Sequence, residues 1–316
     1  MMNRKEFLYQ SAALAGSLAL PSFLSNGGST GKERDAELTI LYTNDTHSRI
    51  EPFPVNSRQF AGLGGIARRA SLIEKVRQTR KNVLLLDAGD IFHGTPWFDV
   101  FGGSVDLRLM TRMGYDAAAV GNHEFDRGTD GFAEAAQKAG FPFLAANYDV
   151  RNSPMNPFVE RQMVREFSGF RVGIFGLGIG FAGVVERKNS GNVRSYDPIR
   201  NAETAIQSLK EYHRCDMIIC LSHLGFSHNH TRNDDLRLAE MVEGIDLIIG
   251  GHTHTFMEEP LLVKNDGGNE THITQMGHSG IRVGRIDVSF GAENSPFPFS
   301  MSCSYYTIGN ETKVNE

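Results

Sequence analysis

The sequence predicts an α/β fold whose sheets also contain antiparallel strands. Two patterns lead to this prediction. From Glu37 onward, short apolar runs alternate with amphipathic helical segments. The later segment 273–290 alternates apolar and polar residues in the way a β-hairpin does. With 316 residues, 40% of them hydrophobic, the chain is long enough to bury one large core or two modest ones.

Seven apolar runs predict buried strands, each ending in polar residues. They span 38–45, 83–90, 117–126, 143–149, 171–178, 217–225 and 246–254. Five amphipathic segments between them predict helices, several of which end at glycine. These segments are 64–80, 106–114, 129–140, 202–214 and 234–244. We find no internal repeat and no further boundary, so we expect residues 34–316 to form one domain.

The first 33 residues have the pattern of an export signal followed by a linker. A basic start at Arg4 and Lys5 precedes the apolar stretch 12–20 and the turn-forming string SNGGSTG. That stretch is shorter than the roughly 18 residues needed to span a bilayer, so no stable membrane anchor is expected after signal removal. The string RKEFL resembles a twin-arginine signal with lysine in second place, which leaves the export route open. We expect a periplasmic or secreted protein.

Composition excludes some classes of partner. A net charge of -5 and a pI of about 6.1 indicate no basic surface for long nucleic acids. The three cysteines, Cys215, Cys220 and Cys303, show no C-x-x-C spacing, so we expect buried thiols with at most one disulfide bridge.

Potential metal ligands follow five of the predicted strands. In α/β sheets, binding sites form at the carboxyl ends of strands. A single histidine there would usually be structural, but five independent coincidences favour one shared site. The residues at these five ends are Asp45 and His47, Asp90, Asn122 and His123, His223, and His252 and His254.

The spacing of these residues indicates the kind of site. Side chains two positions apart on an extended segment point the same way, so each D-x-H or H-x-H pair can face one cavity. Nearby glycines indicate sharp turns or close backbone approach, namely Gly89, Gly121, Gly250 and Gly251. Imidazole, carboxylate and amide donors without cysteine suit Zn, Mn, Fe or Co. Seven candidate ligands are more than one tetrahedral ion binds, and two divalent ions are therefore implied.

Six strings in the chain together resemble a known family. YTNDTH, DAGDIFHGTP, GNHEFD, NYD, GGHTHT and QMGHSGIRVGRIDVSF are similar to the calcineurin-like metallophosphoesterases, and within them to the catalytic domain of the 5'-nucleotidase branch. The resemblance covers about residues 37–290. It implies a four-layer αββα sandwich of two mixed sheets flanked by helices. It also implies one ion held by Asp45, His47, Asp90 and His254, and another by Asp90, Asn122, His223 and His252, with Asp90 bridging.

The expected chemistry is hydrolysis of a phosphate ester. Two ions about 3.5–4 Å apart polarise the phosphate and lower the pKa of a bound water until hydroxide is available to attack phosphorus. His123 is then free to assist the leaving oxygen, with Asp126 orienting its ring. Asn122 and His123 are expected to contact the phosphate. For Glu124 we expect a supporting role.

Other polar residues carry weaker expectations. His93 is as consistent with an incidental loop position as with substrate contact, and Asn147 is expected to support the site. We interpret four histidines outside the pattern as solvated or structural: His228, His230, His272 and His278. The string G-x-G-x-x-G at 178–183 lacks room for the following helix that dinucleotide binding requires.

These observations favour an exported phosphomonoesterase that acts on nucleotides. A phosphodiesterase or pyrophosphatase, of the 2',3'-cyclic nucleotide or UDP-sugar type, or a hydrolase of sulfur esters, is the alternative. A non-catalytic binding protein would show a damaged ligand set, and none is seen. Two-domain bacterial 5'-nucleotidases carry a second domain that binds the nucleobase. Because this sequence ends about 25 residues after the last predicted strand, we expect either a separate chain with that role or a more open site.

Overall fold

A computed structural model describes residues 36–315, except 230, 266, 292–298 and 310–312. The predicted export signal and linker, residues 1–33, lie outside these described residues. No helix in the described part of the chain is long and apolar enough to cross a membrane.

The first sheet has eight strands in the order β16-β15-β14-β1-β2-β3-β4-β6. It is mixed, because β1 pairs in parallel with β2 and antiparallel with β14. Its strands are β1 (Ala36–Thr43), β2 (Val83–Asp87), β3 (Ala117–Ala119), β4 (Phe143–Leu144), β6 (Val159–Glu160), β14 (Arg282–Phe290), β15 (Phe299–Thr307) and β16 (Lys313–Asn315).

The second sheet has six strands in the order β12-β13-β11-β10-β8-β7 and is also mixed. Its strands are β7 (Gln162–Phe167), β8 (Phe170–Gly178), β10 (Met217–His223), β11 (Leu247–Gly250), β12 (Leu261–Lys264) and β13 (Glu270–Thr274). A separate two-stranded sheet pairs β5 (Tyr148–Asp149) with β9 (Arg194–Ser195).

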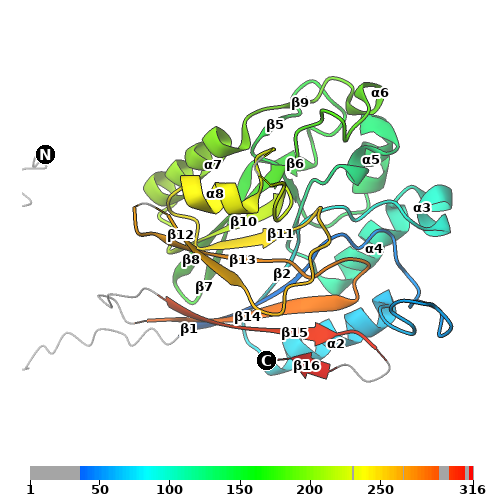
Figure 1. The fold of residues 1–316 in the computed structure, drawn as a ribbon, viewed down its shortest axis with the longest axis horizontal. Coiled ribbons are helices and arrows are strands. Elements are labelled where there is room, and N and C mark those ends of the chain that lie inside the picture. The colour runs from blue at the N-terminus through cyan, green and yellow to red at the C-terminus, as the bar shows by residue number, and fades with distance from the viewer. Residues whose placement is uncertain (1–35, 230, 266, 292–298, 310–312, 316) are drawn as a thin grey trace, which may run out of the picture. The chain divides into compact units, whose positions relative to one another are not determined.

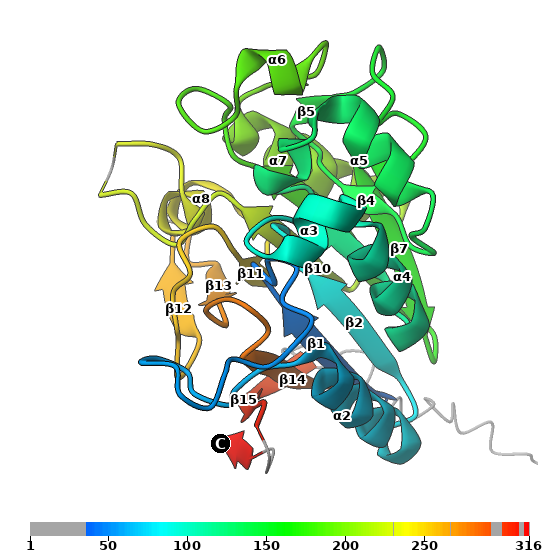
Figure 2. The ribbon, with the colours of Figure 1, turned by 90° about the vertical axis from the view of Figure 1, so that its right-hand side faces the viewer.

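Helices cover the outer face of each large sheet (Figures 1 and 2). The α-helices are α2 (Ile66–Thr79), α3 (Pro96–Phe101), α4 (Ser104–Met113), α5 (Gly128–Ala136), α6 (Arg187–Ser190), α7 (Pro198–Gln207) and α8 (Asp235–Met241). A 3₁₀ turn, η1, spans His123–Phe125, and a π-turn, η2, spans Ser208–Tyr212 and continues α7.

Alternate side chains of the central strands enter different cores. In β2, Leu84 and Leu86 pack in the core between the two sheets, whereas Leu85 packs in the core under α2 and α4. In β10, Ile219 faces the inter-sheet core and Ile218 the core under α7 and α8. Strands buried on both faces read as continuous apolar runs. The predicted four-layer αββα sandwich is confirmed.

Three predicted elements differ from the structure. The strand expected at 117–126 ends at Ala119, because GNHEFD forms a turn. The strand expected at 143–149 is two short strands, β4 and β5, in different sheets. The prediction of a hairpin within 273–290 is wrong, because β13 belongs to the second sheet and β14 to the first. Since β14 pairs antiparallel with both β1 and β15, the antiparallel component itself is confirmed.

The G-x-G-x-x-G segment is followed only by a turn and the four-residue α6, as expected for a chance match. The inner strands of the two large sheets position the predicted metal ligands. β1, β2 and β3 are parallel to one another, as are β10 and β11, so the carboxyl ends of each set lie together. The backbone N–H of Asp45 donates to the carbonyl of Gly89, and the His223 ring lies against the carbonyl of Ala88. The loops from both sheets therefore meet at one place.

Candidate metal centre

Six of the seven predicted ligands bring donor atoms together from four strand ends. Their donor atoms form two groups, and within each group one atom per residue lies within 4.8 Å of the others. The first group is Asp45, His47 and His254, and the second is Asp90, His223 and His252. The ligand sets that the family resemblance implied stay a prediction, because they also include Asn122 and share Asp90 between the two ions. Asn122 follows β3, and its backbone immediately precedes the His123 N–H that donates to Asp90 Oδ1 at 2.8 Å.

Within each group, some donor atoms lie about as close together as hydrogen-bonded atoms. His47 Nε2 lies 2.9 Å from His254 Nε2, and the latter lies 3.3 Å from Asp45 Oδ1. In the second group, His223 Nε2 lies 3.1 Å from Asp90 Oδ2. Imidazole nitrogens and carboxylate oxygens directed at the same small volume form a donor set suited to a divalent ion.

The opposite ring nitrogens of two histidines are held by backbone carbonyls. His47 Nδ1 lies 3.1 Å from Phe92 O, and His223 Nδ1 lies 2.7 Å from Ala88 O. Because a carbonyl only accepts hydrogen bonds, each Nδ1 carries the proton. In the neutral ring, the lone pair then sits on Nε2, which faces the cluster. This is the usual arrangement of histidines that ligate metals.

Burial makes these groups costly without a ligand. Asp45 and His223 are fully buried, and Asn122 Oδ1 is buried with no hydrogen-bond partner among the described residues. An unpaired buried amide oxygen is destabilising, whereas a bound cation would satisfy it. Burial and the neighbouring His223 ring lower the pKa of His252 to about 4, which keeps its imidazole neutral and able to ligate. The residues present therefore fit divalent ions.

The backbone of the ligand loops is strained. Five of the seven predicted ligands have positive φ: Asp45 (48°), His47 (49°), Asp90 (54°), His252 (70°) and His254 (54°). Non-glycine residues rarely adopt this conformation, and such strain concentrates at functional sites. Loop hydrogen bonds hold it in place, including His47 N to Asp90 O at 3.1 Å.

The predicted close approach at the flanking glycines is confirmed. A Cβ at Gly89 would lie 2.9 Å from Gly121 N and 2.9 Å from His223 Nδ1. A Cβ at Gly251 would lie 2.9 Å from Ala88 O. At Gly121 and Gly250, a Cβ would clash with the Asp90 and Asp235 carboxylates respectively. At these four positions, a side chain larger than hydrogen would therefore force its neighbours to shift.

His123 and Asp126 form a hydrogen-bonded pair beside the cluster. His123 Nδ1 lies 2.9 Å from Asp126 Oδ2, and the His123 side chain is 29% exposed. Burial alone would lower the pKa of His123, but Asp126 and Asp90 outweigh it and raise the pKa above its ordinary value. His123 Nε2 lies 4.0 Å from Asp90 Oδ2. The ring can therefore meet a substrate at the edge of the cluster.

Glu124 ties two of the ligand loops together. Its buried carboxylate accepts hydrogen bonds from the backbone N–H groups of Asp90, Ile91, Phe92 and Gly121. These donors belong to the loops after β2 and β3. The side chain thus has the supporting position expected from the sequence.

Sequence reasoning left the role of His93 open and missed the contacts of Gln275 and His278 beside the cluster. The His93 ring stacks on His123 with centroids 4.1 Å apart, and His93 Nδ1 lies 2.7 Å from Asp126 Oδ2. Gln275 orients the loop after β11 by donating to Gly251 O at 2.7 Å. The His278 ring lies 5.0 Å from that of His254. Only the proximity of His93 to Asp90 in sequence could have signalled any of these contacts.

The remaining polar residues and the cysteines lie outside the groups of predicted ligands. The His228 ring lies 5.7 Å from that of His252, but its Nε2 is held by Leu224 O. Asn147 bonds Gly178 of β8 through both amide atoms, and its side-chain hydrogen bonds reach no predicted ligand in the described part of the chain. His230 lies outside the described residues. The three cysteines are free thiols, and Cys220 is buried.

Comparisons with known proteins agree on one family. Residues 38–256 match the family description "Calcineurin-like phosphoesterase". A snake venom 5'-nucleotidase of Gloydius brevicauda is 34% identical over 280 residues, which cover 80% of this chain and 45% of that protein. The trifunctional nucleotide phosphoesterase protein YfkN of Bacillus subtilis is 31% identical over 311 residues, with 88% and 20% covered.

A solved structure shares the fold at similar identity. The 5'-nucleotidase precursor from Thermus thermophilus has a TM-score of 0.76 and 32% identity, covering 86% of this chain and 54% of that one. The chain spans about half the length of this protein and of the venom enzyme.

Proposed function

Since the chain belongs to the calcineurin-like phosphoesterase family, we propose that it is a metal-dependent hydrolase that cleaves phosphate esters of nucleotides. The observation that carries this proposal is the convergence of the donor atoms. Asn122 Oδ1, on the turn beside Asp90, is buried without a hydrogen-bond partner in the described part of the chain. Relatives named as 5'-nucleotidases, 32–34% identical over most of this chain, support the nucleotide part.

The proposed ligand sets follow the two groups of donors. Asp45, His47, Asp90 and His254 would hold one ion, and Asp90, Asn122, His223 and His252 the other. Such ions, whether Mn, Zn, Fe or Co, supply Lewis acidity to the phosphate and acidify a coordinated water. The chain itself contributes the carbonyl contacts that direct His47 Nε2 and His223 Nε2 inward.

His123 is proposed to assist the leaving group. Asp126 Oδ2 accepts a hydrogen bond from His123 Nδ1–H, so Nε2 is the atom available to donate a hydrogen bond to the departing oxygen. The Asp126 carboxylate also offsets positive charge on the ring. Asn122 and His123 are proposed to contact the phosphate, because both lie on the turn next to Asp90.

Phosphodiester or pyrophosphate hydrolysis is the second candidate. It is favoured by the similarity to a protein named as a trifunctional nucleotide phosphoesterase. Two-ion chemistry suits both phosphate esters and pyrophosphates, so the choice of substrate depends on contacts outside the metal cluster. A separate chain that resembles the C-terminal domain of 5'-nucleotidases is proposed as a source of such contacts.

We further propose that the mature protein, residues 34–316, is exported to the periplasm or secreted. The basic and then apolar pattern of the first 33 residues supports this. The venom origin of one relative is consistent with export.

The test combines metal analysis with phosphate release. The purified chain is supplied with Mn²⁺, Zn²⁺ or Co²⁺, and bound metal is counted by elemental mass spectrometry. Phosphate release is followed from AMP and p-nitrophenyl phosphate directly, and from a cyclic nucleotide and a nucleotide sugar with added phosphatase. We expect two ions per chain and release from AMP. Asn122→Ala should lose metal and activity, whereas His123→Ala should lose activity alone. Two bound ions without hydrolysis of any ester would overturn the proposal.

A further inference from the structure

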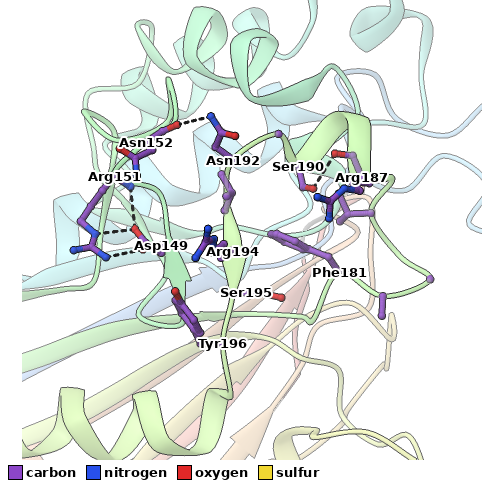
Figure 3. A pocket seen from close by; sticks show the side chains of 15 residues that line it. Asp149, Arg151, Asn152, Phe181, Arg187, Ser190, Asn192, Arg194, Ser195 and Tyr196 are labelled. Atoms are coloured by element: carbon purple, nitrogen blue, oxygen red, sulfur yellow. Dashed lines mark hydrogen bonds and ion pairs between the residues drawn. The ribbon is translucent and has the colours of Figure 1, made fainter.

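A second cavity lies outside the metal centre, between the β5–β9 sheet and the segment 181–193 that contains α6 (Figure 3). Its volume is about 990 Å³, and none of the predicted metal ligands lines it. The volume is at the upper end of the roughly 300–1,000 Å³ typical of small-molecule sites. Asn189 of α6 donates to Asp126 O at 3.3 Å, so one wall adjoins the GNHEFD turn.

The cavity is positively charged although the chain as a whole is acidic. Its charged lining residues are Arg151, Arg187, Arg194 and Asp149, which leaves an excess of two positive charges. Arg151 forms a two-pronged ion pair with Asp149, at 2.7 and 2.9 Å. Within the described part of the chain, neither Arg187 nor Arg194 has an acidic partner within 4.0 Å. Asp149, the only acidic residue of the lining, is already paired with Arg151, so the remaining positive charge can bind an anion.

Strand pairing directs Arg194 into the cavity. Asp149 of β5 is the register partner of Arg194 of β9, so the two side chains lie on the same face of this small sheet. Tyr196, two residues after Arg194, also lines the cavity and is 48% exposed. Figure 3 shows Arg194 and Tyr196 near Asp149, with Phe181 and Arg187 contributed by the opposite segment.

Two aromatic rings provide apolar surface beside these charges. Phe181 packs against Phe125 and Tyr148, with ring centroids 5.0 and 4.9 Å away, which holds the ring at the cavity wall. Tyr196 is anchored through its backbone N–H, which donates to Asn147 O at 2.8 Å. Exposed aromatic faces stack on planar groups such as nucleobases.

We propose that this cavity is a second binding site for organic phosphates of nucleotide size. Arg187 and Arg194 bind the phosphate through paired N–H donors, and Tyr196 and Phe181 contact the planar base. The site performs no chemistry of its own. It goes beyond the proposed function and does not depend on it, because binding here needs neither the metal ions nor turnover.

Isothermal titration calorimetry at low salt tests the proposal. The probes are a non-hydrolysable phosphonate analogue of AMP, inorganic phosphate and adenosine. Each is titrated into the metal-loaded protein, and again after chelation and dialysis, which remove binding at the metal centre. The variants are Arg187→Ala/Arg194→Ala and Tyr196→Ala. Arg200→Ala is the matched control, because Arg200 is an exposed arginine of α7 outside the cavity.

We expect the AMP analogue to bind the metal-free protein, and at least tenfold more weakly in the double arginine variant. The affinity should fall with added salt. Tyr196→Ala should weaken binding of the analogue but not of inorganic phosphate. Arg200→Ala should bind each probe with the affinity of the wild type. An unchanged melting temperature of each variant excludes misfolding.

Three results would overturn the proposal. Analogue binding that vanishes with the metals would belong entirely to the metal centre. Equal affinity in the double arginine variant would exclude the cavity. If none of the probes binds, the basic surface serves another partner, such as an acidic protein. Hydrolysis of AMP is measured separately, so failure here leaves the proposed function standing, and the reverse also holds.

Discussion

Replacing Gly251 by alanine should weaken metal binding through steric contact alone. Gly251 precedes the predicted ligand His252, and its φ is not in the left-handed region, so alanine can adopt its backbone conformation. The new methyl group would lie 2.9 Å from Ala88 O, 2.9 Å from His223 Nδ1 and 3.0 Å from Asp45 Oδ2. It would therefore press on the hydrogen bond that orients His223, and on another predicted ligand.

The expected size of the effect follows from these contacts. Overpacking a close-packed site costs about 1–3 kcal/mol. Disturbing the hydrogen bonds that orient metal ligands typically lowers metal affinity by roughly 10–100-fold, which is about 1.4–2.7 kcal/mol. We therefore expect at least a tenfold rise in the metal dissociation constant, and a lower free energy of unfolding of the metal-free chain.

Competition against a metal-sensitive dye measures the affinity, and urea unfolding measures the stability. Gly180→Ala is the matched control, because a Cβ at Gly180 has no neighbour within 4 Å and its φ is also outside the left-handed region. It should behave as the wild type. If Gly251→Ala retains metal affinity within twofold, the reasoning from close packing is wrong.

Three further predictions concern catalysis, metal linkage and pH. His123→Ala should lower kcat by about 10²–10⁴-fold while bound metal stays at the wild-type level, and loss of metal would contradict a role in proton transfer. Removing metal should lower the free energy of unfolding by about 2.7 kcal/mol for each site that had been held at 100 times its Kd, as checked by urea unfolding with and without chelator. Burial raises the pKa of Asp246 from 3.8 to about 6, so its contribution to stability is full below pH 3.8 and is lost as the pH rises through 6. Asp246→Asn, which can still accept the hydrogen bond from Ile218 N, should match the wild type near pH 3.5 and exceed its stability by up to about 3 kcal/mol at pH 7.5. If Asp246→Asn and the wild type have equal stability at both pH values, the raised pKa of Asp246 is contradicted.

The central strands were predictable because their signals are local. In β2 and β10, every second side chain enters a different core, so both faces are apolar and the sequence shows an uninterrupted run. The two-residue strands β4, β5, β6 and β9 carry no periodicity of their own. They exist because a neighbouring strand offers hydrogen bonds, and that partner is distant in sequence.

Strand pairing was the main error in the fold prediction. The segment 273–290 alternates like a hairpin, yet β13 pairs with β11 and β12 whereas β14 pairs with β1 and β15. Alternation reports only that one face of a strand is more buried than the other. Which sheet supplies the buried surface depends on the whole chain.

The sequence by itself determined which side chains could form the site, because polar residues that follow parallel strands lie at the same edge of a sheet. That these edges of the two sheets meet was decided by the tertiary structure. Only the tertiary structure decided how the loops bend between these ligands. The positive φ of His93 (83°) turns its ring onto His123, and the fold brings Gln275 against Gly251. The arginine-lined cavity likewise depends on pairing between β5 and β9. Such contacts join segments far apart in the chain, so no local pattern of residues encodes them.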